Sequence, residues 1–217
     1  MLHKVVQLGG KSYFWLEKTN VVSMIQEYQV SGFRVREYEE LESTNTEAER
    51  VGWSELEDKM VILTYRQTQG RGQVGNHWES EPGKNISMTV VFKPRELLAG
   101  QQFAVSMVIA LGACDFISRY VSGCSVKWPN DIYVGDRKIS GILIEHSIMG
   151  RYVGGSLCGI GVNINQERFL SDAPNPVSLF QLIGEEIPVK RALEELLDCI
   201  GKRYETILDY EGLERDF

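Results

Sequence analysis

The sequence predicts an α+β domain in which a mixed β-sheet is backed by α-helices. The apolar patterns run in the order strands, helix, strands and helices, which is typical of this class. Apolar residues recur at helical spacing over residues 102–120, which predicts a largely buried helix lying across the sheet. Residues 139–144 are apolar on both strand faces, which predicts a strand in the middle of a covered sheet.

The elements before the buried helix follow from local patterns. Residues 33–38 alternate like a strand, and the capping-box spacing of Thr44 and Glu47 predicts a helix that runs towards residue 59. Strands are expected at 61–65 and 86–92, where β-branched residues are frequent. Between them lies a polar, glycine-rich segment. Because it has little apolar content to pack, we expect it to be mobile and to become ordered when a ligand binds.

The second half of the chain begins with two strands joined by a tight turn at Gly135-Asp136. A glycine-punctuated strand over 152–164 and an amphipathic helix over 193–208, which stops near Gly212, complete the domain.

We divide the chain into a short N-terminal segment, residues 1–32, and one domain, residues 33–217. A hairpin around residues 9–10 and a helical patch near 21–28 are expected in the short segment. We expect this segment to be too short for a DNA-binding domain.

Composition narrows the class of protein. The net charge of −7, from 23 basic and 30 acidic residues, argues against a nucleic-acid backbone binder. No stretch reads as apolar over the ~18 residues that a membrane span requires, because Asp115 interrupts the best candidate, residues 104–117. The four cysteines lack metal-ligand spacing, which favours buried free thiols over a zinc site and predicts a cytoplasmic location.

Charged residues stand inside the apolar tract around the Gly135-Asp136 turn. Burial of a charge is costly unless the charge is paired or meets a ligand, so Lys127, Asp131 and Lys138 are candidate site residues. One alternative is that Asp131 only pairs with Lys127. The neighbouring Trp128 is expected to lie in the core.

Residues 70–75 match the dinucleotide fingerprint G-x-G-x-x-G. That fingerprint requires a helix directly afterwards, and residues 76–83 read as a loop, so we reject a Rossmann site. The segment still offers glycines that let backbone N–H groups approach an anion, with Arg71 as a bidentate cation. The alternative is a surface loop with incidental glycines.

Seven short motifs, spread over residues 43–165, occur together and in the order of one known family. They are Ser43-Thr44-Asn45, Gln67-x-x-Gly70-Arg71-Gly72, Trp78, Gly83-x-Asn85, Lys127-Trp128-Pro129-Asn130-Asp131, Lys138-x-x-Gly141-Ile142 and Gly159-x-Gly161-Val162-Asn163. This set resembles the catalytic domain of biotin–protein ligases. The resemblance implies the class II synthetase-like mixed sheet that lipoate ligases and octanoyltransferases share.

The resemblance also implies a reaction. Biotin and ATP, with Mg²⁺, would form biotinyl-5′-adenylate, and a lysine of a biotin carboxyl carrier domain would then take the biotinyl group. Attack of a carboxylate on the α-phosphate builds negative charge on oxygens, so fixed cations and a metal fit this chemistry.

Roles for individual residues follow from the same resemblance. Lys138 and Arg71 would be catalytic, and Asp131 would contact the metal. The implied biotin-binding residues are Ser43, Thr44, Asn45, Gln67, Gly70, Arg71, Lys138, Gly141 and Ile142. The implied ATP-binding residues are Arg71, Trp78, Lys127, Asn130, Asp131, Lys138 and Asn163.

The chain also departs from the family pattern. Relatives commonly have basic residues where this sequence has Gln73 and Asn76, and Lys84 is an extra charge that could compensate. The small C-terminal β-barrel of many relatives is expected to be absent. Two alternatives stay open, a lipoate or octanoate ligase or transferase of the same fold and a non-catalytic biotin-binding sensor. The acceptor protein and a possible homodimer are also left open.

Overall fold

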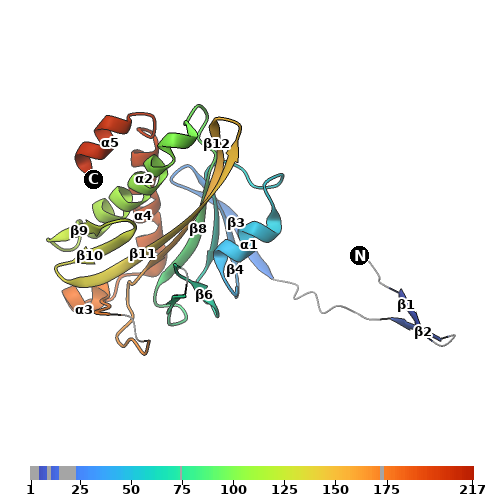
Figure 1. The fold of residues 1–217 in the computed structure, drawn as a ribbon. Helices are drawn as coiled ribbons and strands as arrows, with labels where there is room; N and C mark the ends of the chain where they lie inside the picture. The colour runs from blue at the N-terminus through green and yellow to red at the C-terminus, as the bar shows by residue number, and fades with distance from the viewer. Residues whose placement is uncertain (1–4, 9–10, 15–22, 74, 172–173) are drawn as a thin grey trace.

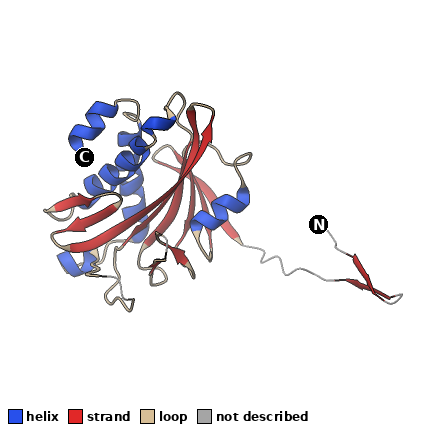
Figure 2. Ribbon diagram, in the orientation of Figure 1, coloured by secondary structure: helices blue, strands red, loops and turns tan. Residues whose placement is uncertain are grey.

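A mixed eight-stranded sheet forms the centre of the computed structural model, which describes residues 5–8, 11–14, 23–73, 75–171 and 174–217. In spatial order its strands are β3 (Met24–Val30), β4 (Phe33–Tyr38), β5 (Met60–Thr64), β8 (Ile86–Phe92), β12 (Tyr152–Val162), β11 (Arg137–Met149), β10 (Asp131–Val134) and β9 (Cys124–Lys127). Strands β4 and β5 are parallel and the other neighbours are antiparallel. The predicted mixed sheet with helices is therefore confirmed (Figure 2).

Two long helices cover one face of the sheet, as Figure 1 shows. They are α2 (Phe103–Ile117), which follows the 3-10 turn η1 (Ala99–Gln101), and α4 (Val189–Tyr204). The shorter helices are α1 (Thr44–Val51), α3 (Leu179–Ile183) and α5 (Tyr210–Asp216). Two small hairpins pair β1 (Val5–Leu8) with β2 (Lys11–Phe14) and β6 (Gly70–Arg71) with β7 (His77–Trp78).

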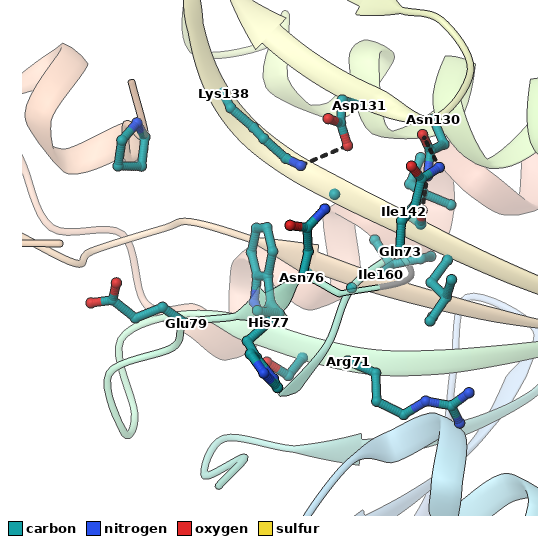
Figure 3. Close-up of a pocket in the computed structure, with 18 of the residues that line it drawn as sticks. Arg71, Gln73, Asn76, His77, Glu79, Asn130, Asp131, Lys138, Ile142 and Ile160 are labelled. Atoms are coloured by element: carbon teal, nitrogen blue, oxygen red, sulfur yellow. Dashed lines mark hydrogen bonds and ion pairs between the residues drawn. The ribbon is translucent and has the colours of Figure 1, made fainter. Parts of the chain in front are cut away.

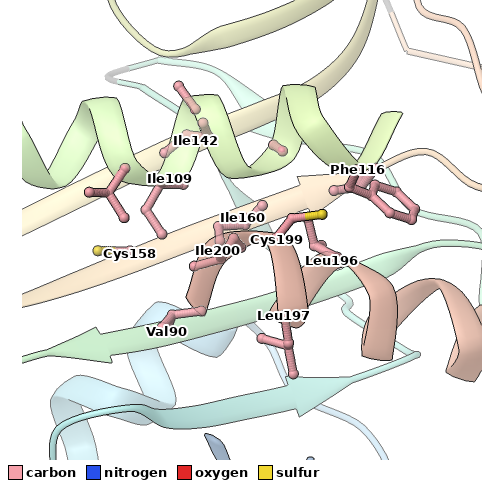
Figure 4. Packing of buried hydrophobic residues seen from close by; sticks show 14 of the residues in the cluster. Val90, Ile109, Phe116, Ile142, Cys158, Ile160, Leu196, Leu197, Cys199 and Ile200 are labelled. Carbon is pink, nitrogen blue, oxygen red and sulfur yellow. The ribbon is translucent and has the colours of Figure 1, made fainter. Parts of the chain in front are cut away.

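The main hydrophobic core lies between the sheet and helices α2 and α4. Figure 4 shows Ile109 of α2 and Ile200 of α4 grouped with Cys158 and Ile160 of β12. The two helices approach most closely at Gly112, where a Cβ would collide with the Cα of Ile200. This close approach gives the helix-weakening glycine a packing reason.

A second, smaller core lies on the opposite face of the sheet, under helix α1. Its buried residues are Tyr38, Leu41, Ala48, Leu56, Met60, Ile62, Val91 and Leu157. Helix α1 contacts β5, β8 and β12 and so covers only part of this face.

The segment Ala99–Ile117 is long and apolar enough to cross a membrane, judged by length and composition alone. The expectation that the chain has no such stretch is therefore wrong. Eleven α2 residues between Ala104 and Ile117 are buried, and the helix packs on α4 and the sheet. Burial from both sides accounts for its nearly uniform apolar character.

The helical patch expected near residues 21–28 is wrong where the structure describes it, because Met24–Val30 is strand β3. A two-residue turn explains the difference. Ser31 and Gly32 both have positive φ, 49° and 79°, which suits a tight hairpin that pairs Val30 with Phe33. The hairpin expected around residues 9–10 is present as the β1–β2 pair, and those two residues lie outside the described part of the chain.

Both ends of helix α1 differ from the prediction. Its N-cap is Ser43, which makes no side-chain capping hydrogen bond, so the capping box of Thr44 and Glu47 is wrong. The Glu47 carboxylate instead accepts from Arg50 at 2.7 Å. The helix ends at Val51 because Gly52 has a φ of 81°. The predicted final helix is also two helices, with Gly212 inside α5.

Candidate functional site

The register of the sheet places one row of small or charged residues across six strands. Each member of the row is the direct partner of the next: Thr64, Ser87, Gly161, Gly141, Asp131 and Lys127. Their neighbours along the strands, such as Met88 and Val162, belong to the main core. Since side chains alternate along a strand, this row lies on the face opposite α2 and α4. We call it the pocket face.

A β-bulge brings Lys138 to the pocket face. Ile132 pairs with Ser140, but the next residue, Tyr133, pairs with Lys138, so Ile139 is an extra residue in β11. In a regular strand Lys138 and Gly141, three residues apart, would point to opposite faces. The bulge reverses the alternation and lets both residues face the pocket, a common function of bulges near active sites.

A cavity of about 650 Å³ lies over the pocket face. Thirteen of the predicted site residues line it: Ser43, Thr44, Asn45, Gln67, Arg71, Trp78, Lys127, Asn130, Asp131, Lys138, Gly141, Ile142 and Asn163. The exception is Gly70. A Cβ at Gly70 would collide with the Trp78 carbonyl oxygen, so this glycine lets β6 and β7 approach each other.

At one end of the cavity, short polar side chains form a buried network. The Gln67 Oε1 accepts a hydrogen bond from the Thr44 backbone N–H at 3.0 Å. Asn45 is 2% exposed, accepts from the Thr89 hydroxyl at 2.5 Å and donates to Glu145 at 2.9 Å. A Cβ at Gly159 would collide with the Asn45 Oδ1, so only glycine leaves room for this amide. The network fixes a set of donors and acceptors beside the cavity.

Trp78 packs flat against the glycines of the pocket face. A Cβ at Gly161 would collide with its indole ring, and one at Gly141 would be in tight contact with it. The Trp78 Nε1, the Ser87 Oγ and the Asn163 Oδ1 are buried and have no hydrogen-bond partner among the described residues. All three residues line the cavity, and because buried polar groups are normally paired, a small shift that uncovers these atoms would let a bound molecule complete their hydrogen bonds.

An ion pair joins Lys138 and Asp131 inside the cavity, with 2.7 Å between Nζ and Oδ1 (Figure 3). The alternative that Asp131 only pairs with Lys127 is therefore wrong. The Lys127 ammonium instead lies 4.7 Å from the ring centroid of Tyr133. Both members of the Lys138–Asp131 pair are about one-quarter exposed, 26% and 27%, so a ligand can reach them.

Trp128 is not in the core, contrary to the prediction, because its side chain is 74% exposed. It follows the edge strand β9, at the turn into β10, where no neighbouring element covers it. The adjacent Asn130 does enter the site. Its side chain donates to the Ile142 carbonyl and accepts from the Gln73 Nε2 at 3.1 Å (Figure 3).

Arg71 lines the cavity, but two carboxylates hold its guanidinium. Its Nη1 lies 2.8 Å from Glu49 of α1 and its Nη2 lies 2.8 Å from Glu145 of β11. The pKa of Arg71 is raised mainly because its guanidinium donates a hydrogen bond to Glu49; burial partly offsets this effect, and Glu145 adds to it. Figure 3 shows this side chain directed away from Lys138. Contact with a ligand would therefore require Arg71 to exchange partners.

Gln73 and Asn76 line the cavity, whereas Lys84 does not. Its ammonium lies 2.6 Å from Glu186, beside a separate cavity of about 410 Å³. The structure thus keeps Lys84 away from the Lys138–Asp131 pair.

Thr89, Glu145 and Glu79 also shape the site, although none of them belongs to the motifs that predicted it. A signal existed for Thr89, because Ser87 and Thr89 are two apart in a run that is otherwise apolar. A signal also existed for Glu145, because it lies four residues after Gly141 in the same strand and therefore points to the same face of the sheet. No comparable signal existed for Glu79, because it lies in a loop and not in a regular strand.

Comparisons with known proteins agree with this geometry. The model of the biotin/lipoate A/B protein ligase family matches residues 38–163. The biotin--[acetyl-CoA-carboxylase] ligase of Paracoccus denitrificans is 33% identical over 177 residues, 79% of this chain and 72% of that protein. The bifunctional ligase/repressor BirA of Bacillus subtilis (strain 168) is 26% identical over 188 residues, 84% of this chain. The chain spans 57% of the length of that relative.

A solved structure shares the fold. The biotin protein ligase from Aquifex aeolicus, in complex with biotin and ATP, matches with a TM-score of 0.66 at 25% sequence identity. The match covers 79% of this chain and 70% of that one. The family model, the relatives and the fold confirm what the motifs indicated: this chain belongs to the biotin/lipoate A/B protein ligase family.

Proposed function

We propose that this chain activates biotin with ATP as biotinyl-5′-adenylate and transfers the biotinyl group to a lysine of a carrier domain. One observation carries the proposal: a single cavity joins a buried polar network around Asn45 to the Lys138–Asp131 ion pair. The cavity volume of about 650 Å³ suits small-molecule ligands. The Aquifex aeolicus protein of the same fold binds biotin and ATP.

The polar end of the cavity fits the ring of biotin. A ureido group has two N–H donors and one carbonyl acceptor, and the network around Thr44, Asn45 and Gln67 supplies matching groups. Ile142 and Ile160 also line the cavity and offer apolar contact to the valeryl chain. A site that hydrogen-bonds its ligand rejects analogues that lack those groups, which favours biotin over lipoate or octanoate.

The charged end of the cavity fits the chemical step. A biotin carboxylate oxygen attacks the α-phosphorus of ATP, the bond to the bridging oxygen breaks and pyrophosphate leaves. Lys138 would exchange Asp131 for the ligand oxygens and stabilise their negative charge. An incoming lysine amine then attacks the carbonyl carbon of the adenylate and releases AMP and a proton.

Magnesium would neutralise charge on the phosphates when it is bound. Mg²⁺ in nucleotide sites commonly takes one or two protein carboxylates and completes its shell with phosphate oxygens and water. The described residues contain no group of three His, Cys, Asp or Glu side chains able to hold a metal by themselves. Asp131, a carboxylate on the cavity wall, fits the single-carboxylate arrangement.

The proposed acceptor is a biotin carboxyl carrier domain. The name of the Paracoccus denitrificans relative supports a carboxylase as the source of that domain. Dependence on ATP and the four free cysteines support a cytoplasmic location.

The experiment that tests the proposal is ATP–pyrophosphate exchange with biotin, lipoate and octanoate side by side. We expect biotin alone to support exchange, and addition of a carrier domain to give a product heavier by one biotinyl group. Faster exchange with lipoate or octanoate would assign the chain to the other branch of the family. Biotin binding without exchange would indicate a sensor.

A further inference from the structure

Glu79 makes a set of hydrogen bonds that the proposed reaction does not use. It directly follows β7 and lines the cavity beside Trp78. Its carboxylate accepts from the backbone N–H groups of Leu170, at 2.9 and 3.1 Å, and Ser171, at 2.7 Å. It also accepts from the Gln166 side chain at 2.9 Å. Figure 3 shows the carboxylate directed away from Lys138 and Asp131, so it is not placed to react.

Gln166 links this carboxylate to the glycine-rich segment. Gln166 is 1% exposed, and its Oε1 accepts from the Glu81 backbone N–H at 3.0 Å and from Asn85 at 2.5 Å. Asn85 is fully buried and accepts from the Ile164 backbone N–H at 3.0 Å. A continuous network, buried at Gln166 and Asn85 and exposed where Glu79 meets Leu170 and Ser171, therefore ties residues 79–85 to residues 164–171. Satisfied buried networks of this kind hold one geometry.

Residues 166–171, which we call the wall segment, border the cavity. Phe169 and Ser171 line it together with Trp78. Leu170 is 89% exposed, so its side chain contributes no packing that would hold the segment in place. Partial burial alone would raise the pKa of the Glu79 carboxyl. Hydrogen bonds from Ser171, Leu170 and Gln166 outweigh it and lower that pKa, so the carboxylate stays ionised and accepts charge-assisted bonds.

We propose that Glu79 is a positioning residue that holds the wall segment beside Trp78, so that indole and wall together bind the nucleotide. This inference rests on the proposed function, because it takes ATP as the occupant of that end of the cavity. Glu79 and Trp78 are adjacent in sequence, so displacement of the carboxylate moves the wall relative to the indole. Glu79 touches no reacting atom, and its loss should weaken ATP binding without changing biotin binding.

The test compares Glu79→Gln with Glu81→Gln. The first variant keeps the shape but presents an amide N–H₂ to backbone donors, whereas the second changes an exposed glutamate two residues further on. We expect Glu79→Gln to speed amide exchange at Leu170 and Ser171 and to raise both the calorimetric Kd and the KM for ATP by about 10-fold. The Kd and KM for biotin should stay within about 2-fold of wild type, and Glu81→Gln should behave as wild type.

Three results would overturn the inference. Unchanged amide hydrogen exchange at Leu170 and Ser171 in Glu79→Gln would mean that Glu79 does not hold the wall segment. Faster exchange with unchanged ATP binding would mean that the wall segment does not bind the nucleotide. Equal weakening of ATP and biotin binding would indicate a general structural role. Failure of the proposed function is seen separately, as a wild-type chain that binds no ATP.

Discussion

The two faces of the central sheet are built from the same strands but serve opposite purposes. In β8, Met88 and Val90 enter the main core under α2 and α4, whereas Ser87 lines the cavity and Thr89 hydrogen-bonds the buried network around Asn45. In β12, Cys158 enters that core, whereas Gly161 lies under the Trp78 ring. One face is filled with large apolar side chains, whereas the other carries glycines and short polar groups under the cavity and has large apolar side chains only in the smaller core under α1.

This difference separates stability from chemistry. Burial of apolar area is the main favourable term in folding, so the helix-covered face supplies most of the stability. The pocket face gives up side-chain volume to leave room for a ligand, and its charged residues form pairs that a ligand can replace. Substitutions on the pocket face should therefore change activity more than stability, and substitutions on the helix-covered face should do the reverse.

The largest expected effect is on adenylate formation and comes from substitution of Lys138 on the pocket face. Lys138→Ala should reduce adenylate formation by ~10²–10³, because removal of one preorganised electrostatic donor typically costs ~3–4 kcal/mol of transition-state stabilisation. Its side chain is 26% exposed and outside both cores, so the melting temperature should change little.

The control for this variant is Lys202→Ala, which removes an exposed lysine that pairs with Asp198 on α4. That variant should form adenylate at the wild-type rate. If Lys138→Ala formed adenylate as fast as Lys202→Ala, Lys138 would not be catalytic.

The same substitution on each face sharpens the comparison. Gly161→Ala would push a Cβ into the Trp78 ring, and Gly112→Ala would push one into the Ile200 backbone. Overpacking typically lowers the unfolding free energy by ~1–3 kcal/mol. In α2 the higher helix propensity of alanine offsets up to ~1 kcal/mol of that loss. We expect Gly161→Ala to raise the KM for ATP at nearly unchanged stability, and Gly112→Ala to lower the unfolding free energy at unchanged KM.

Urea unfolding measures the unfolding free energy, and pyrophosphate exchange measures the KM for ATP. Gly100→Ala is the control, because a Cβ there would meet no atom within 4 Å. If both variants lost stability and ATP binding to the same degree, the division between the faces would be wrong.

A smaller effect is expected at Gln73, which lines the cavity and donates to Asn130. A charged hydrogen bond contributes ~1.5–3 kcal/mol and a neutral one ~0.5–1.5 kcal/mol, so Gln73→Arg should hold the adenylate phosphate ~1–2 kcal/mol more tightly. That is roughly a 5–30-fold slower release. Lys84→Ala should leave release unchanged because Lys84 pairs with Glu186.

Release can be followed by trapping the adenylate from a preformed complex. Faster release from Lys84→Ala would show that this lysine reaches the phosphate after all.

The smallest expected effect concerns the two halves of the glycine-rich segment over the pocket face. Residues 79–85 are held by the network of Gln166 and Asn85, whereas residues 70–73 and 75–76 are held mainly by a two-residue strand pair and by the ion pairs of Arg71. Biotin should therefore slow amide exchange in 70–76 and change it little in 79–85. Equal slowing in both halves would contradict this division, and no slowing in either would mean that biotin does not order the segment.

How far the sequence predicts this structure depends on the range of the interactions. Local patterns predicted β8 at Ile86–Phe92 and the core of α2, because their apolar periodicity is strong. The family resemblance implied one site for Lys138 and Gly141, and both line the same cavity. Alternation alone would have separated them, because the bulge at Ile139 depends on pairing with β10.

Contacts between distant segments limited the rest. The partners of Arg71 come from α1 and β11, and Glu79 binds backbone groups about ninety residues later, so neither could be read from neighbouring residues. Trp128 was misplaced because its hydrophobicity says nothing about whether a neighbouring strand covers it.

The most direct test of the account is a crystal structure of the chain with biotin and a non-hydrolysable ATP analogue. The account predicts both molecules in the one cavity over the pocket face, with the Lys138 ammonium released from Asp131 and placed between the biotin carboxylate and the α-phosphate. Biotin or nucleotide bound elsewhere on the chain, with the Lys138–Asp131 pair intact, would contradict it.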